Sequence, residues 1–303
     1  MSGASVHTRD AAAGRSPFRA TLRALLRDRL ALAGIVIVAL LVLAAAFAPL
    51  IAPQDPYDLT QLDIMDNRLP PGSESAAGFT YLIGTDDQGR DLFSAILYGL
   101  RTSIIVGVSS AAIALAIGAS LGLLSGYVGG RTDAFLMRVV DIQLSFPAIL
   151  IALIFLAILG QGVDKIVLAL VVTQWAYYAR TIRGSALVER RRSYVDAARS
   201  MALPDRSIVF RHILPNCLPP LIVVATMRVA YAIMLEATLS FLGIGLPVTE
   251  PSLGLLIANG FEYLLSGDTW ISFFPGLALL LLIIGINLIG DALRDILNPR
   301  RES

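Results

Sequence analysis

The sequence predicts an all-α integral membrane protein with six transmembrane helices, on the basis of its composition, its apolar runs and the distribution of its arginines. Of its 303 residues, 56% are hydrophobic and only 16% are charged, and the mean hydropathy is +0.72. Soluble globular domains carry about 25% charged residues, so this chain has too little charge to cover a water-facing surface. Contact with lipid replaces the missing polar shell.

Five stretches without charge reach or approach the roughly 20 residues that cross a hydrocarbon core as a helix. They are 30–53, 102–130, 142–163, 213–227 with its continuation, and 269–290. A sixth stretch, 166–179, is short and spans the membrane only if Arg180 and Arg183 extend toward a headgroup layer. All six are expected to be helices, because an isolated strand in lipid would leave its backbone groups unpaired. Small residues within 102–130, including Gly118 and Gly122, predict close packing against another helix.

The distribution of arginine sets the predicted orientation, because loops that remain in the cytosol carry an excess of Lys and Arg. The stretch 180–212 holds eight arginines, whereas the loop 54–101 holds eight acidic residues against three arginines. Both termini are therefore predicted to be cytosolic. The predicted division is a cytosolic segment 1–29, a first transmembrane helix 30–53, an extracytoplasmic loop 54–101, a five-helix core 102–292 that includes the loop 184–212, and a cytosolic tail 293–303.

Composition also limits the chemistry of the chain. Cys217 is the only cysteine, so an intrachain disulfide and a cysteine-based metal cluster are excluded. No metal site, catalytic residue or cofactor is expected. With a net charge of +1, the chain gives no sign of a nucleic-acid partner.

The long outer loop ends in a motif before the second span. Thr85 and Gln88 match the capping box, which predicts that a short helix starts there and leads into the span. A plain connector fits the same spacing.

The loop between the fourth and fifth spans has a helical pattern. Three apolar residues recur at helical spacing: Val195, Ala198 and Met201. Ser193 can cap this helix together with Asp196, Pro204 ends it, and Ser207 can start a second helix. The pattern predicts two short amphipathic helices that meet at an angle on the cytosolic face. A basic loop that anchors the topology on anionic headgroups fits these residues equally well.

This loop resembles the EAA loop of permease subunits in binding-protein-dependent ATP-binding-cassette importers. The family pattern is E-A-A, three residues, G, nine residues and I-x-L-P, and the matching residues here are Asp196-Ala197-Ala198, Ala202 and Leu214-Pro215. The sequence departs from it with Asp for Glu, with Ala202 for Gly, and with His212 where Ile is common. A positive φ at Ala202 would cost about 1 kcal/mol, and Pro204 offers another way to turn the chain.

Other segments resemble the C-type subunit of oligopeptide, dipeptide and nickel permeases, so the resemblance covers nearly the whole chain. These segments are Gly84-Thr85-Asp86 with Gly89-Arg90-Asp91 before the second span, 239–245 with Pro251, Ser252 and Gly254 after the fifth, and Phe274-Pro275-Gly276 with 287–291 and 293–295 in the last.

The resemblance implies the fold of a type I importer permease in the inner membrane of a bacterium. It implies four kinds of partner: a second homologous permease, two ATPase subunits, an extracytoplasmic solute-binding protein and the lipid bilayer. The ATPase-coupling residues would be Asp196, Ala197, Ala198, Ala202, Leu214 and Pro215. Peptides are the expected cargo, with nickel chelates, glutathione or another small solute as alternatives. ATP hydrolysis is expected on the partner subunits, because this chain has no Gly-rich phosphate loop with Lys.

Ionisable residues inside a membrane are costly and usually face a pathway or a partner. Arg228 and Glu236 lie within the fifth span. Arg228 is expected either to line the pathway or to form a structural pair, and Glu236, near the outer end, is a candidate for a gate or for a contact with the binding protein. Arg138 and Asp141 are expected to pair on one helix face. Trp175, Tyr177 and Tyr178 are expected to anchor a helix at the membrane interface.

Two other functions compete with the importer subunit. An ion-coupled secondary transporter would show paired acidic residues or broken helices in two related halves, and the spans show no such repeat. A membrane scaffold that only anchors a cytosolic partner is the third hypothesis.

Overall fold

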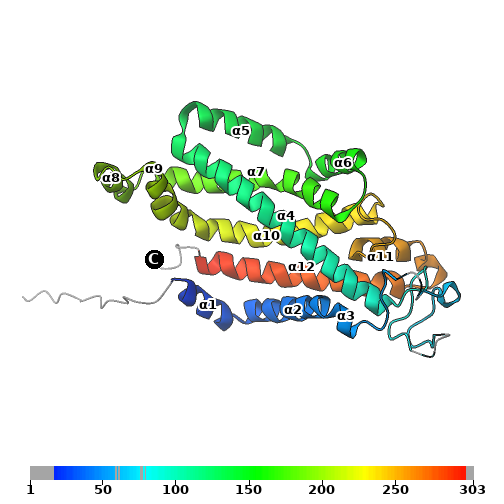
Figure 1. Cartoon of the computed structure of the whole chain (residues 1–303). Coiled ribbons are helices and arrows are strands. Elements are labelled where there is room, and N and C mark those ends of the chain that lie inside the picture. The colour runs from blue at the N-terminus through cyan, green and yellow to red at the C-terminus, as the bar shows by residue number, and fades with distance from the viewer. Residues whose placement is uncertain (1–16, 59, 61, 76–77, 79, 298–303) are drawn as a thin grey trace, which may run out of the picture.

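The computed structural model describes residues 17–58, 60, 62–75, 78 and 80–297, which form a bundle of long helices without a β-strand in these ranges (Figure 1). Residues 1–16 and 298–303 of the predicted cytosolic ends lie outside the described residues. The long helices are α2 (Arg29–Ala46), α4 (Leu92–Val128), α5 (Gly130–Ser145), α6 (Ala148–Leu159), α7 (Val163–Glu189), α10 (Leu214–Phe241) and α12 (Trp270–Leu297). The shorter ones are α1 (Pro17–Arg27), α3 (Ala48–Ile51), η2 (Ile64–Asp66), α8 (Ser193–Ser200), α9 (Asp205–Ser207), η3 (Ile208–Ile213), α11 (Leu253–Phe261) and η4 (Leu264–Ser266).

Four helices of the described chain are long and apolar enough to cross a membrane: α2, α4, the continuous helix Asp205–Phe241 and α12. The bent pair of α5 and α6 gives a fifth span if the two cross together. α7 has 27 residues, but its polar and charged residues, Arg180 and Arg183 among them, make it less apolar than these helices. The protein therefore has four or five apolar spans, and a sixth span through α7 stays a prediction.

The predicted span 142–163 is wrong as a single helix. α5 ends at Ser145, α6 begins at Ala148, and the two helices meet at 88°. Pro147 causes the break, because its ring disfavours the helical conformation in the residue before it. Phe146 accordingly has φ −97° and ψ 141°.

α4 crosses the bundle and packs along α7 at very short backbone distances. A Cβ atom added at Gly118 would lie 2.3 Å from the carbonyl oxygen of Trp175, and one added at Gly122 would lie 2.2 Å from that of Ala179. Small residues let membrane helices approach this closely. The predicted packing of Gly118 and Gly122 against another helix is confirmed.

The segments outside the long helices gather at two ends of the bundle (Figure 1). α1, α8, α9 and the end of α12 lie at one end, which we call the loop end. α3, α11 and the described residues of the connection 52–91 lie at the other, which we call the turn end. Both ends of the described chain, Pro17 and Leu297, therefore lie at the loop end.

Candidate functional site

The segment 193–215 joins α7 to α10 at the loop end and contains the residues matched to the EAA pattern. α8 begins at Ser193, so Arg192 takes the cap position, and it makes no side-chain capping bond. The predicted Ser193 cap is therefore wrong. Val195 and Ala198 hold α8 in place instead, because both are buried among residues of α4, α7 and α10. Met201 leaves this apolar face, because α8 ends before it.

α8 ends in a left-handed turn at Ala202, whose φ is 54°. The Ala202 N–H donates to the Arg199 carbonyl oxygen at 2.9 Å, and the Leu203 N–H donates to the Ala198 carbonyl oxygen at 3.2 Å. These two bonds form a Schellman motif, whose left-handed residue is usually glycine. The positive φ therefore occurs at the position where the family pattern has Gly and this chain has Ala. Pro204 comes after the turn and precedes the next helix.

The second predicted helix of this loop is not a separate element. It begins at Asp205 rather than at Ser207, and it continues through the π-helical stretch Ile208–Ile213 into α10 without a break. Leu214 is half-buried and Pro215 is exposed, and both lie directly after the π-helical stretch. The segment 193–215 is thus one short helix followed by the protruding end of a membrane helix.

The residues matched to the EAA pattern do not all face outward. Asp196 and Ala197 are exposed, the Asp196 side chain by 69%. Ala198 is 2% exposed and packs inside its own chain, so it offers no surface to a partner. Met201 and Phe210 are 68% and 64% exposed nearby along the chain. A carboxylate and large apolar side chains are therefore uncovered on one segment.

The Tyr194 hydroxyl connects α8 with the helices before and after it. It donates to Glu189 Oε2 at the end of α7 (2.6 Å) and accepts from Asn216 Nδ2 at the start of α10 (3.2 Å). Burial, followed by the hydrogen bond to Glu189, raises the pKa of Tyr194 to about 12, so the hydroxyl keeps its proton at physiological pH. Sequence analysis missed this residue, because a tyrosine in the first turn of a short helix carries no distinctive signal.

A groove of about 700 Å³ lies between α7, α10 and α12 toward the loop end. Its polar lining residues are Thr181, Ser185, Glu189, Asn216 and Arg294. Sequence analysis missed the groove as well. The available signal was the four-residue spacing of Thr181, Ser185 and Glu189, which places them on one helix face. Polar rows on membrane helices usually face protein or a water-filled cavity.

Arg228 lies on α10 one turn deeper in the bundle than Val224, which lines the groove. Its guanidinium carbon lies 3.4 Å from the centre of the Tyr177 ring and 5.2 Å from that of Tyr231. Among the residues that the structure describes, no carboxylate forms an ion pair with Arg228. The guanidinium is therefore held by aromatic faces, with its N–H edges left for another group.

The predicted interfacial anchor is wrong for two of its three aromatic residues. Tyr177 stacks against Arg228, at the middle of α10, and Tyr178 is fully buried within the bundle. Helix packing places these rings inside the protein, whereas an anchor would present them to the headgroups.

Glu236, the other predicted membrane charge, does not line the groove. It is fully buried, and it accepts from the Ser103 hydroxyl of α4 at 2.9 Å and from the Ser240 hydroxyl of α10 at 2.8 Å. At 1.5 Å of rise per residue, it lies about 12 Å beyond Arg228 along α10. Arg228 and Glu236, which sequence analysis treated together as charges of the fifth span, therefore have different surroundings.

The predicted pair of Arg138 and Asp141 is also wrong. Asp141 pairs instead with Arg180 of α7, because α5 packs directly on that helix. A second carboxylate of α5, Asp133, accepts from Arg183 Nη2 at 2.6 Å. The two arginines that were predicted to extend toward headgroups therefore hold α5 to α7.

The turn before α4 does not contain the predicted helix. α4 begins only at Leu92, and Asp91 caps it by accepting from the Ser94 N–H at 2.8 Å. The Thr85 hydroxyl donates to the Asp66 carbonyl oxygen at 2.6 Å. The capping-box prediction fails because a partner distant in the sequence holds the Thr85 side chain.

The Asp86 turn, residues 84–91, is closed by a buried ion pair. Asp86 accepts from Arg90 Nε at 2.6 Å and from the Arg90 backbone N–H at 3.0 Å. Gly89 makes this turn possible, because its φ is 75° and an added Cβ would lie 2.2 Å from the Asp63 carbonyl oxygen. The Gly and Asp residues of the C-type motif thus have structural roles.

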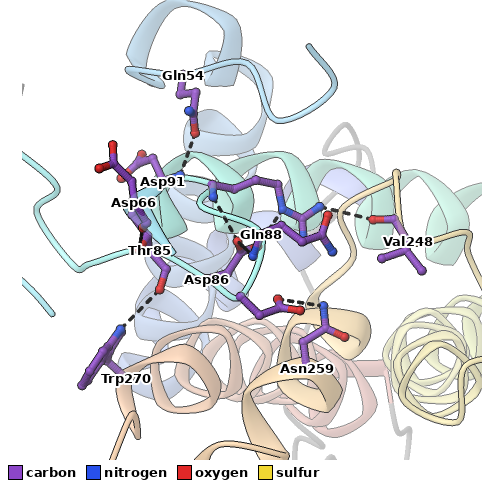
Figure 2. A network of polar contacts seen from close by, with 11 residues as sticks. Gln54, Asp66, Thr85, Asp86, Gln88, Asp91, Val248, Asn259 and Trp270 are labelled. Atoms are coloured by element: carbon purple, nitrogen blue, oxygen red, sulfur yellow. Dashed lines mark hydrogen bonds and ion pairs between the residues drawn. The ribbon is translucent and has the colours of Figure 1, made fainter. Parts of the chain in front are cut away.

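The Asp86 turn also attaches to four segments that are distant in the sequence (Figure 2). The hydrogen bonds run from Arg90 Nη1 to the Val248 carbonyl oxygen (3.3 Å), from Asn259 Nδ2 to Asp87 Oδ1 (3.3 Å), from Trp270 Nε1 to the Thr85 carbonyl oxygen (3.4 Å), and from the Asp91 N–H to Gln54 Oε1 (2.6 Å). The turn therefore connects the start of α4 to the segment after α3, the loop after α10, α11 and α12.

Two family models match this chain. The family model described as binding-protein-dependent transport system inner membrane component matches residues 118–303. A second model, the N-terminal TM domain of oligopeptide transport permease C, matches residues 16–71.

Individual relatives match over nearly the whole chain. A chain of Brucella abortus named as a peptide transport system permease is 43% identical over 95% of this chain and 93% of its own length. The di/tripeptide transport system permease protein DppC of Pseudomonas aeruginosa is 37% identical over 95% of this chain and 94% of its own. The glutathione transport system permease protein GsiD of Pectobacterium atrosepticum is 37% identical over 95% and 93%.

A solved chain shares the fold at lower identity. It comes from the inward-facing conformations of the MetNI methionine ABC transporter, and it matches with a TM-score of 0.55 and 22% identity over 67% of this chain and 96% of that chain.

Proposed function

Since this chain belongs to the family of binding-protein-dependent transport system inner membrane components, we propose that it is the C-type permease subunit of an ATP-driven peptide importer. The observation that carries the proposal is the protruding 193–215 segment, which leaves Asp196, Ala197 and Met201 uncovered in the single chain. ATP hydrolysis in this family lies on separate subunits, and the permease is not itself an enzyme.

The proposed assembly has a second homologous permease, two ATPase subunits and an extracytoplasmic solute-binding protein. The groove between α7, α10 and α12 supports the second permease. Its lining is mostly apolar but includes the ionisable Glu189 and Arg294, and ionisable residues on a membrane bundle usually face protein or a water-filled cavity rather than lipid. A second permease facing this groove would complete the translocation pathway.

The proposed topology has six spans, with α7 and the bent pair α5 and α6 counted as one each, in a bacterial inner membrane. Both termini are assigned to the cytosol. In support, Pro17 and Leu297 lie at the same end as the arginine-rich loop, and cytosolic loops are enriched in arginine. The division is a cytosolic segment 1–29, a first helix 30–53, an extracytoplasmic loop 54–101, a core 102–292 with the coupling loop 184–212, and a tail 293–303.

We assign the ATPase contact to the exposed part of the 193–215 segment. Asp196, Ala197 and Ala202 would touch the ATPase, and the uncovered Met201 and Phe210 supply apolar area for the same contact. Ala198, Leu214 and Pro215 would act by holding the segment in position. Because Asp205–Phe241 is one continuous helix, a push on its protruding end would move the membrane part of α10.

The proposed cargo is a di- or oligopeptide, in agreement with relatives that are named for peptides and for di- and tripeptides. Glutathione is an alternative favoured by the Pectobacterium relative, and it is itself a tripeptide. Nickel chelates stay an alternative that only the sequence resemblance offers. An ion-coupled secondary transporter is disfavoured by the family membership.

The coupling assignment is tested by Asp196→Arg in the complete importer reconstituted into proteoliposomes. Reversing an exposed charge leaves the fold intact, so we expect normal membrane insertion together with a loss of ATP-dependent peptide uptake. Asp291→Arg is the matched control, because Asp291 is an exposed carboxylate on α12 outside this segment. Wild-type uptake by Asp196→Arg would refute the docking assignment.

A further inference from the structure

We infer that Arg228, stacked on Tyr177 at the head of the groove, binds the carboxylate of the peptide as it passes through the membrane. The inference rests on the proposed function and adds to it one binding point and the chemical group that it takes. Three observations support it: the Arg228 guanidinium has no carboxylate partner in the described part of the chain, the groove lies next to Arg228 and Tyr177, and the proposed cargo carries a carboxylate.

The Arg228 guanidinium is a charge in the middle of a membrane helix without a carboxylate partner in the described part of the chain. Insertion of a charge at that depth is costly, so contact with lipid alone is unfavourable. The Tyr177 ring, 3.4 Å away, covers one face of the guanidinium. Stacking of this kind leaves the five N–H donors at the edge free to bind an anion.

The groove lies directly next to this pair. Thr181 lines the groove four residues after Tyr177, and Val224 lines it four residues before Arg228. Residues four apart share one face of a helix, so Tyr177 and Arg228 extend the groove by one turn toward the middle of the bundle. The Thr181 hydroxyl even donates to the Tyr177 carbonyl oxygen, at 2.9 Å. A solute that left the Arg228 site toward the loop end would enter this groove, whose lining includes Thr181, Ser185 and Asn216.

The cargo chemistry matches a single positive site. Peptides of different sequence share a C-terminal carboxylate, and glutathione also carries free carboxylates. A guanidinium edge binds a carboxylate through two parallel hydrogen bonds. A site that binds only this shared carboxylate would accept peptides with different side chains. Stacking on tyrosine keeps the guanidinium oriented toward that carboxylate.

The other candidate for this role is a carboxylate from the second permease, which would make Arg228 a structural residue between subunits. The two readings predict different defects. Loss of an intersubunit ion pair impairs assembly, whereas loss of a substrate site impairs transport of carboxylate-bearing cargo in an assembled complex.

The test uses the complete importer in proteoliposomes, with saturating binding protein and with trialanine or trialanine amide as the probe. Arg228→Gln removes the charge and keeps hydrogen-bonding groups. Because hydrogen bonds to a charged group are among the stronger ones, we expect the maximal uptake rate of trialanine to fall about tenfold or more. The uptake rate of trialanine amide should change by less than about twofold, because the amide lacks the C-terminal carboxylate that Arg228 binds.

Two further variants calibrate this result. Arg228→Lys keeps the positive charge without the planar edge, and it should retain more trialanine uptake than Arg228→Gln. Arg180→Gln removes an arginine from α7 that is already paired with Asp141, and it should affect both probes equally and weakly. Basal ATPase activity and co-purification of the second permease are measured for every variant.

The outcomes separate the inference from the proposed function. A wild-type complex that imports neither dialanine nor trialanine with ATP would overturn the peptide importer and the Arg228 site together. If the wild type imports them, the site alone is refuted by wild-type trialanine uptake in Arg228→Gln, by an equal fall for both probes, or by loss of the second permease from the complex. A selective fall for trialanine in an intact complex supports it.

Discussion

At the turn end, the side chains of the Arg90–Asp86 ion pair are 1% and 0% exposed, whereas at the loop end those of the Arg199–Asp196 pair are 41% and 69% exposed. The two pairs contain the same chemical groups but differ in their surroundings. A buried pair fixes geometry, because separating its charges is costly. An exposed pair contributes little to stability and leaves its charges available to another molecule. The comparison indicates a rigid turn end and a loop end built for contact.

The two ends also differ in how their segments are attached. The Asp86 turn hydrogen-bonds to four distant segments, through Gln54, Val248, Asn259 and Trp270 (Figure 2). At the loop end, α8 is attached by two buried apolar side chains, Val195 and Ala198, by the Tyr194 hydroxyl, and by Arg199, whose guanidinium carbon lies 5.9 Å from the centre of the Tyr127 ring of α4. These contacts include no buried ion pair, which allows α8 to respond to a partner.

The largest expected effect is on the stability of the turn end. Asp86→Ala leaves Arg90 buried and unpaired, so we expect the free energy of unfolding to fall by about 3–5 kcal/mol. Thermal unfolding of the purified chain in nanodiscs measures the loss.

The control for Asp86→Ala is Asp141→Ala, which breaks the more exposed pair with Arg180. Its expected cost is about 0–1 kcal/mol. Equal shifts for the two variants would contradict the contrast between buried and exposed pairs.

A smaller effect is expected from Tyr194→Phe, which removes the hydroxyl that joins α8 to α7 and α10. A lost hydrogen bond to a charged group costs about 1.5–3 kcal/mol. We also expect fewer peptides imported per ATP hydrolysed, because α8 would transmit its displacement less well. Parallel assays of uptake and ATPase activity in proteoliposomes give this ratio.

Tyr81→Phe is the matched control at the turn end. The Tyr81 hydroxyl donates to Asp66 Oδ2 at 2.8 Å, and burial followed by that bond raises the pKa of Tyr81 to about 12, as for Tyr194. This variant should lose stability but keep the ratio of uptake to hydrolysis. A changed ratio of uptake to hydrolysis in Tyr81→Phe, or an unchanged ratio in Tyr194→Phe, would contradict the claim that α8 transmits displacement and the turn end does not.

The smallest effect is a gain. Ala202→Gly relieves the positive φ at the end of α8, and we expect about 1 kcal/mol of added stability. Ala197→Gly, inside the same helix, should instead cost about 1 kcal/mol. Thermal unfolding of both variants tests the sign, and a loss of stability in Ala202→Gly would show that the turn is not strained.

The sequence by itself predicted the membrane class, the apolar spans α2, α4, α10 and α12, and the importer-permease resemblance, and it left the turn after α8 open between Ala202 and Pro204. These features depend on composition, on the length of apolar runs and on local backbone preferences, which neighbouring residues decide. The family comparisons confirm the permease assignment.

Only the tertiary structure decided which partners the polar side chains take. Thr85 matched a capping box but bonds to Asp66, Asp141 pairs with Arg180 rather than Arg138, and Tyr177 holds Arg228 rather than an interface. A side chain within reach of several donors or acceptors is settled by helix packing, which brings together residues far apart in the chain. The groove that leads from Arg228 exists for the same reason, because it is formed by three helices and is encoded in none of them alone.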